Sequence, residues 1–249
     1  VHGVSYAVIS KWLSQQCARG KVPCVPHSVE LPDEAGDLRQ ELGIPDGALV
    51  LGCHGGRDSF NVPCAVQAVE LLLAYQPDLM IVLATNLNSH AREKCEIAGA
   101  PVIFFNRLSA DGLGFGVSCD NIEGGRRAAD HLIDLGHRAL LYVSAFPGAS
   151  TNVERQQGFN DRAVERGLPP PQVIEAGRFS YEAGYAAGLA MRDLPLRPDG
   201  VFCANDIVAI GFIEGVQEGL GLKVPEDVSV IGYDNITMAG WPSHRLTTV

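Results

Sequence analysis

Residues Gly200–Val249 have the sequence GVFCANDIVAIGFIEGVQEGLGLKVPEDVSVIGYDNITMAGWPSHRLTTV, which predicts a strand, a helix and a second strand. Val201–Ala204 is a short apolar run, and Ile207–Val216 carries apolar side chains at roughly helical spacing. Val228–Gly232 is a second apolar run. Two strands joined by a helix normally run parallel, with a right-handed crossover. The stretch therefore predicts one unit of a parallel α/β sheet.

A polar residue follows each of these two predicted strands. Asn205 stands directly after the first strand, and Asp234 follows the second one after a single tyrosine. Parallel neighbouring strands end at the same edge of their sheet, so we expect both side chains at that edge. Open α/β folds bind their ligands there. The stretch thus predicts a ligand site as well as a fold.

The alternation of strands and helices extends upstream to about Pro77. It predicts an α/β fold class with a doubly wound parallel sheet. The other predicted strands are Leu79–Ala84, Val102–Phe105, Val117–Cys119, Leu140–Ser144 and Val173–Ala176. The other predicted helices are Ala91–Ala98, Gly124–Leu135, Val153–Arg166 and Ser180–Asp193.

Five motifs resemble those of one known family. They are FCANDIVAIG (Phe202–Gly211), LGLKVPEDVSVIGYDN (Leu220–Asn235), LTTV (Leu246–Val249), DNIEGGRRAADHLIDLG (Asp120–Gly136) and NVERQQGF (Asn152–Phe159). In order and spacing the motifs resemble the effector-binding domain of the lac/gal repressor family over about residues 77–249. The resemblance implies a periplasmic-binding-protein-like fold, in which two doubly wound parallel-sheet lobes enclose a ligand cleft. It implies a first lobe at 1–137, a second at 138–236 and a crossover returning toward the first lobe at 237–249.

Residues 1–76 do not share this resemblance. Val25–Pro32 (VPHSVELP) and Leu38–Phe60 (LRQELGIPDGALVLGCHGGRDSF) are loosely similar to the nucleotide-sugar domain of two-lobed glycosyltransferases. The lysine expected after the Gly-rich turn is missing, with Asn61 in its neighbourhood, and the paired-Glu helix has no counterpart downstream. Two interpretations stay open: a divergent first lobe, or a foreign segment fused to a repressor segment as a chimera.

Three residues are the main candidates for ligand contact. Arg155 has a planar guanidinium that can hold two oxygens at once. Asp234 can accept two hydrogen bonds, and Asn205 can donate and accept. Each also has a purely structural interpretation: an Arg stem packed at a helix start, an Asp that forms a turn, and an Asn that caps the helix after it. Their positions in the resembling motifs favour ligand contact.

Further candidates come from the same resemblance. Phe179 matches the aromatic residue that stacks on the effector, although an aromatic ahead of a helix can simply pack there. Ser150 and Thr151 could supply hydroxyl groups, and Asp120 with Asn121 could face the cleft from the first lobe. Weaker candidates follow the predicted strand Leu49–Cys53: His54, Arg57 and Asp58.

Composition limits the classes of function. The 249-residue chain carries a net charge of −10 and no cluster of Lys and Arg, so we do not expect it to hold DNA by itself. Its seven Cys have no Cys-x-x-Cys spacing, which favours a reducing compartment, the cytoplasm, over disulfides or zinc. No signal peptide or membrane-length apolar run is present. Neither a Gly-x-Ser-x-Gly motif nor metal-ligand spacing occurs, so we predict no enzyme, cofactor or metal.

The sequence therefore predicts the ligand-sensing domain of a lac/gal-type transcription regulator. It would bind a small sugar or a similar polar metabolite in the cleft between its lobes. The resemblance implies a homodimer that reaches DNA only through an amino-terminal helix-turn-helix, which this chain lacks. The chain starts without Met and stops within a predicted strand, so we expect a fragment. The alternatives are a glycosyltransferase fragment, a chimera and, less favoured, a periplasmic sugar-binding protein.

Overall fold

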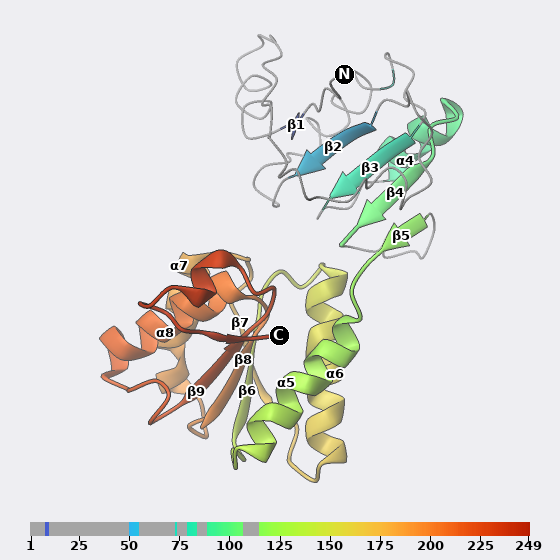
Figure 1. Cartoon of the computed structure of the whole chain (residues 1–249). Helices are drawn as coiled ribbons and strands as arrows, with labels where there is room; N and C mark the ends of the chain where they lie inside the picture. The colour runs from blue at the N-terminus through green and yellow to red at the C-terminus, as the bar shows by residue number, and fades with distance from the viewer. Residues whose placement is uncertain (1–7, 10–49, 55–72, 74–78, 84–88, 107–114) are drawn as a thin grey trace. The chain divides into compact units, whose positions relative to one another are not determined.

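The chain forms two compact units, Val1–Ser118 and Cys119–Val249, in the computed structural model (Figure 1). The structure describes residues 8–9, 50–54, 73, 79–83, 89–106 and 115–249. Among these residues each unit has its own five-stranded sheet, in which every strand pair is parallel. The predicted α/β class with parallel sheets is confirmed.

The first unit has its strands in sequence order, β1-β2-β3-β4-β5. They are β1 (Val8–Ile9), β2 (Val50–His54), β3 (Leu79–Leu83), β4 (Val102–Phe105) and β5 (Phe115–Val117). Helix α4 (Ser89–Ile97) joins β3 to β4. Met80, Val82, Cys95 and Phe104 are buried, so α4 and the central strands share an apolar core.

Strands from the first 76 residues belong to this sheet. Val8 of β1 lies opposite Gly52 of β2, and Gly52 lies opposite Ile81 of β3. This continuous parallel pairing is expected if residues 1–76 are a divergent part of the first lobe. The alternative, a fused foreign segment, stays a hypothesis.

The second unit has the strand order β10-β9-β8-β6-β7. Its strands are β6 (Leu140–Ser144), β7 (Gln172–Glu175), β8 (Gly200–Cys203), β9 (Ser229–Gly232) and β10 (Thr247–Thr248). Its α-helices are α5 (Asn121–Asp134), α6 (Ser150–Glu165), α7 (Tyr181–Ala190) and α8 (Asp206–Leu220), and its 3-10 helices are η2 (Met191–Asp193) and η3 (Thr237–Gly240). None of the helices in the described part of the chain combines the length and apolarity that crossing a bilayer requires.

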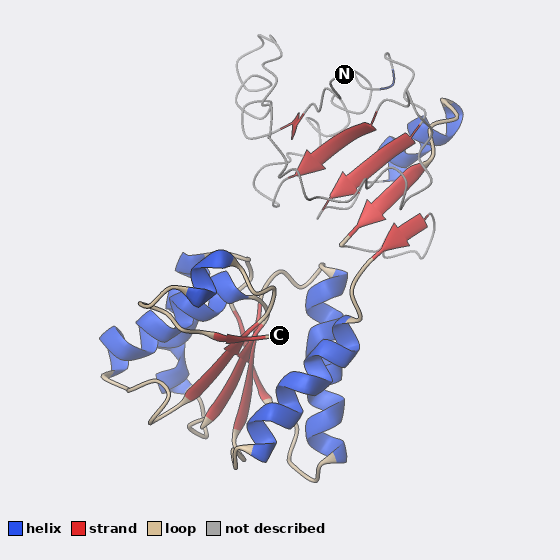
Figure 2. Ribbon diagram, in the orientation of Figure 1, coloured by secondary structure: helices blue, strands red, loops and turns tan. Residues whose placement is uncertain are grey.

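Helices cover both faces of the second sheet. Figure 2 shows α5 and α6 on one face and α7 and α8 on the other. Strands β6 and β8 are buried along their whole length, because each of their faces meets a helix pair. This is why the two strands appear in the sequence as uninterrupted apolar runs, LLYVS and GVFC, rather than as alternating patterns.

Helices α5 and α6 approach each other closely at two glycines. A Cβ atom on Gly125 would lie 2.2 Å from the carbonyl oxygen of Arg155, and one on Gly158 would lie 2.0 Å from that of Ile122. Only glycine fits at such distances. The two helix backbones are therefore in direct contact beside Arg155.

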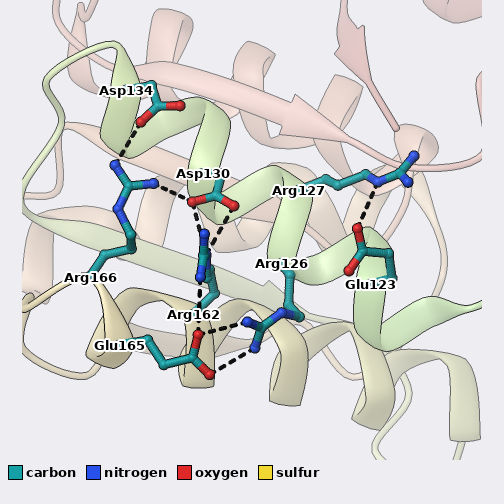
Figure 3. A network of polar contacts seen from close by, with 8 residues as sticks. All are labelled: Glu123, Arg126, Arg127, Asp130, Asp134, Arg162, Glu165 and Arg166. Atoms are coloured by element: carbon teal, nitrogen blue, oxygen red, sulfur yellow. Dashed lines mark hydrogen bonds and ion pairs between the residues drawn. The ribbon is translucent and has the colours of Figure 1, made fainter.

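Ion pairs connect the same two helices on their solvent side (Figure 3). Arg162 of α6 pairs with Asp130 of α5 at 2.9 Å and with Glu165 at 3.1 Å, and Arg126 pairs with Glu165 at 2.6 Å. Arg166 extends the network to Asp130 and Asp134. Hydrogen bonds from Arg126 and Arg162 lower the pKa of Glu165 to about 2.

The boundary between the units differs from the predicted one. The sequence boundary of 1–137 and 138–236 assigned the α5 segment to the first lobe, whereas the structure groups α5 with the second unit. The reason is packing: α5 lies against α6 and buries Ala128, Ala129 and Leu132 in the core of the second unit. The predicted crossover segment 237–249 also lies in this unit, where β10 pairs with β9.

Candidate ligand-binding site

The carboxyl edge of the second sheet gathers polar side chains from several elements. Asn205 follows β8 and Asp234 lies just beyond β9, as the alternating pattern predicts. Helix α6 begins at the same edge and contributes Arg155. The structure thus brings together the three main candidates from the sequence.

Arg155 is the centre of this group. Its side chain is 3% exposed. Its Nε donates to Asn121 Oδ1 at 2.9 Å, Nη1 donates to the carbonyl of Ala204 at 2.6 Å, and Nη2 donates to Asp234 Oδ1 at 3.1 Å. One guanidinium therefore links helix α5, the end of β8 and the end of β9.

The ring of Tyr233 covers the guanidinium. Arg155 Cζ lies 3.6 Å from the ring centroid, within the range of a cation–π contact. Gly124 makes room for the ring, because a Cβ atom there would lie 2.5 Å from it. Burial raises the pKa of the Tyr233 hydroxyl, so the ring stays neutral at ordinary pH.

Asp234 is the accessible member of the group. Its side chain is 36% exposed, and its backbone φ of 102° lies in the left-handed region that non-glycine residues rarely adopt. Burial raises the pKa of its carboxyl group, and the charge of Arg155 together with a hydrogen bond from Asn205 opposes the rise. A partly desolvated carboxylate paired with a guanidinium is suited to accepting hydrogen bonds from a polar ligand.

Asn205 has a structural role in addition to its contact with Asp234. Its Oδ1 accepts a hydrogen bond from Val208 N at 3.1 Å and so caps α8. This bond confirms the capping interpretation of the residue from the sequence. Its predicted contact with a ligand stays a prediction.

The remaining candidates lie at or just before the starts of helices α5, α6 and α7. Asp120 is exposed and caps α5 by accepting from Glu123 N at 2.9 Å. Thr151 is buried in the first turn of α6, and Ser150 is the first residue of that helix. Phe179 is half-buried and packs against the core. Their predicted contacts with a ligand stay predictions.

Candidates in the first unit are mostly outside the described residues. His54 is the last residue of β2, and nothing is described of its side chain. Arg57 and Asp58 lie outside the described part of the chain. Among the described residues, no group of His, Cys, Asp and Glu has the arrangement of a metal site.

Sequence reasoning missed two buried polar residues of the second unit, Asn152 and Asp206. Asn152 is 1% exposed; its Oδ1 accepts from Ala145 N at 2.9 Å and from the Tyr142 hydroxyl at 3.0 Å. Asp206 is fully buried beside Asn205. A polar residue within an apolar run was the available signal for Asp206, but its partners are distant in sequence.

Comparisons with known proteins identify the family. A periplasmic binding protein-like domain family matches residues 129–249. The crystal structure of a LacI-family transcriptional regulator from Burkhoderia phymatum is 33% identical, with a TM-score of 0.68, and the match covers 80% of this chain and 72% of that one. The chain belongs to the LacI family of transcriptional regulators. The resemblance predicted from the motifs is confirmed.

Two more LacI-family comparisons extend this result. The HTH-type transcriptional repressor PurR of Actinobacillus pleuropneumoniae is 30% identical over 191 residues, 76% of this chain and 56% of the repressor. The solved complex of the transcriptional regulator CelR with cellobiose is 27% identical, with a TM-score of 0.71, covering 80% of this chain and 60% of that one. The chain spans about half the length of the curated relatives it matches, 47 to 56% for three of them. These relatives are transcriptional regulators, not the glycosyltransferases considered from residues 1–76.

Proposed function

We propose that this chain is the ligand-sensing domain of its regulator and binds a small sugar or a similar polar metabolite. The observation that carries the proposal is the exposed Asp234 carboxylate, which Arg155 holds at the carboxyl edge of the sheet. Sugars present pairs of adjacent hydroxyl groups, and a fixed carboxylate accepts from two such donors.

The guanidinium supports the carboxylate in two ways. Three of the five N–H donors of Arg155 bond to protein acceptors, and these bonds fix the position of the guanidinium. The two other donors are one N–H on Nη1 and one on Nη2. In our proposal these two donors bond to a ligand oxygen, and the aromatic ring of Phe179 packs against the apolar face of the sugar ring. The regulator CelR was solved as a complex with cellobiose, and this relative supports a sugar as the ligand class.

The proposed signal requires the remaining parts of the regulator. We propose that ligand binding favours one arrangement of a homodimer over another. A ligand changes such an equilibrium only through its different affinities for the two arrangements. DNA would be bound in the cytoplasm by an amino-terminal helix-turn-helix, consistent with relatives described as HTH-type repressors and with the net charge of −10 here.

Isothermal titration tests the ligand site. We expect the chain to bind one or more of a panel of D-glucose, cellobiose and a purine base. Asp234→Asn keeps the shape of the side chain but removes one acceptor and the charge. It should weaken binding by about 1.5–3 kcal/mol, or roughly 10- to 100-fold, as for other lost charged hydrogen bonds.

Asp161→Asn is the matched control, because Asp161 is exposed on α6 and outside the site. Its affinity should equal that of the unmodified chain. Equal affinity of the unmodified chain and Asp234→Asn for the bound ligand would contradict the proposal.

A further inference from the structure

The turn that contains Asp234 is held by hydrogen bonds from three successive backbone N–H groups. Asp234 N donates to the carbonyl of Val249 at 3.2 Å, Asn235 N donates to Thr248 Oγ1 at 3.2 Å, and Ile236 N donates to Asp206 Oδ2 at 2.8 Å. Each acceptor belongs either to the β10 segment or to the start of α8. The shape of the turn therefore depends on elements outside it.

The backbone of this turn needs such support. Asp234 and Asn235 both have positive φ values, 102° and 47°. Two successive non-glycine residues in the left-handed region are strained, and such a conformation persists only where the surrounding structure imposes it. Without the three bonds the turn would relax, and the carboxylate would leave its place beside Arg155.

Asp206 and Thr248 form the common support. Thr248 Oγ1 donates to Asp206 Oδ1 at 2.6 Å while accepting from Asn235 N, so its hydroxyl is used in both directions. Asp206 is fully buried, and its own N–H donates to the carbonyl of Tyr233 at 2.9 Å. A Cβ atom on Gly232 would lie 2.2 Å from Asp206 Oδ1, so glycine there leaves room for this carboxylate.

We propose that Asp206 and Thr248 are positioning residues of the ligand site, which hold the Asp234–Ile236 turn so that the Asp234 carboxylate faces Arg155. Neither residue needs to touch the ligand. The arrangement also joins strand β10 directly to the ligand-binding turn. A displacement of β10 changes the turn, and by thermodynamic reciprocity ligand binding at the turn favours one position of β10.

Amide hydrogen exchange on the ligand-free chain tests the positioning role by itself. Thr248→Val keeps the shape of the side chain and removes the hydroxyl. It should raise the exchange rates of the Asn235 and Ile236 amides by about tenfold or more, because local opening becomes easier. Amides of β6, on the far side of β8 from this turn, should exchange as before.

Two further substitutions serve as controls. Thr248→Ser restores the hydroxyl and should restore slow exchange. Thr247→Val makes the same change at the exposed neighbouring residue and should leave both amides unchanged. Asp206→Asn is a second disrupting variant: its amide nitrogen cannot accept, so one of the two donors loses its partner and exchange at residues 235–236 should also rise.

Titration with cellobiose gives the second measurement. This measurement depends on the proposed function, whereas hydrogen exchange does not. If cellobiose binds, Thr248→Val should weaken its binding about tenfold, measured at a temperature where the variant is fully folded, and Thr248→Ser should not. Unchanged exchange at residues 235 and 236 in both Thr248→Val and Asp206→Asn would overturn the inference, whatever the sugar result. Failure of every ligand to bind, with exchange raised as expected, would instead count against the proposed function.

Discussion

Arg155 combines near-complete burial with three protein acceptors on three different elements. A buried cation is tolerated only when its donors are matched, and here Asn121, the Ala204 carbonyl and Asp234 match them. The side chain therefore stabilises the domain before any ligand arrives. Its planar shape is essential, because three acceptors in different directions require a branched group of donors.

Arg155→Lys should be strongly destabilising although it preserves the charge. An ammonium group can reach only part of this acceptor set, and a buried carbonyl or amide is left without its partner. We expect the free energy of unfolding to fall by about 2–4 kcal/mol, measured by urea denaturation.

Arg127→Lys is the matched control for this substitution. Arg127 is 73% exposed and pairs with Glu123 one helical turn away, a contact that lysine can also make. Its effect should be below about 0.5 kcal/mol. Similar losses in the two variants would show that Arg155 has no special role.

The sequence was sufficient to predict the residues whose place follows from local pattern. Asp234 and Asn205 stand at the ends of apolar runs, and Arg155 lies in a motif of known order. Asp206 could not be predicted, because its burial and its partners arise only when distant segments meet. Thr248, for example, lies 42 positions from the carboxylate it contacts.

Among the helices, the pair α5 and α6 has a polar outer side as well as a glycine contact. The predicted helix 124–135 begins three residues earlier in the structure, at Asn121, because Asp120 caps it. The sequence pattern predicted this helix, but it could not assign the helix to a lobe. That assignment depends on which sheet the apolar face meets.

The ion pairs between α5 and α6 predict a specific dependence of stability on pH. The folded-state pKa of Glu165 is about 2, below the value near 4.5 of a free Glu. Glu165 therefore contributes stability above about pH 4.5, and this contribution is lost as the pH falls toward 2. Chemical denaturation of the unmodified chain and of Glu165→Gln should differ at pH 7 and converge near pH 2.

Salt gives an independent check of the same contact. Glu165 is 48% exposed, so its ion pairs are screened by added ions. The difference in unfolding free energy between the unmodified chain and Glu165→Gln at pH 7 should become smaller in 1 M NaCl. A difference that is constant across both pH and salt would show that the substitution acts through something other than charge.

The molecule as a whole consists of two units with separate sheets, and the second has a complete core of its own. Buried residues of β6, β8, β9 and the four helices α5–α8 make one continuous apolar cluster. A unit of this size with its own core is expected to fold independently. We predict that a chain of residues 119–249 alone unfolds in a single cooperative transition.

Thermal unfolding followed by circular dichroism measures this. The fragment and the full chain should share one transition with the same midpoint to within a few degrees. A gradual, non-cooperative loss of signal in the fragment would contradict the prediction. The same fragment contains Arg155, Asn205 and Asp234. Titrating it with ligand would measure the affinity of the second unit alone.

The glycine contact at Gly125 and Gly158 restricts how the binding site can be redesigned. Because the two helix backbones touch, α6 cannot slide or rotate on α5 to carry Arg155 toward a ligand of another size. New specificities must therefore come from substitutions around a stationary guanidinium. A redesign of ligand specificity should therefore keep Arg155 and the contact between α5 and α6, and should vary surrounding residues such as Ser150 and Phe179.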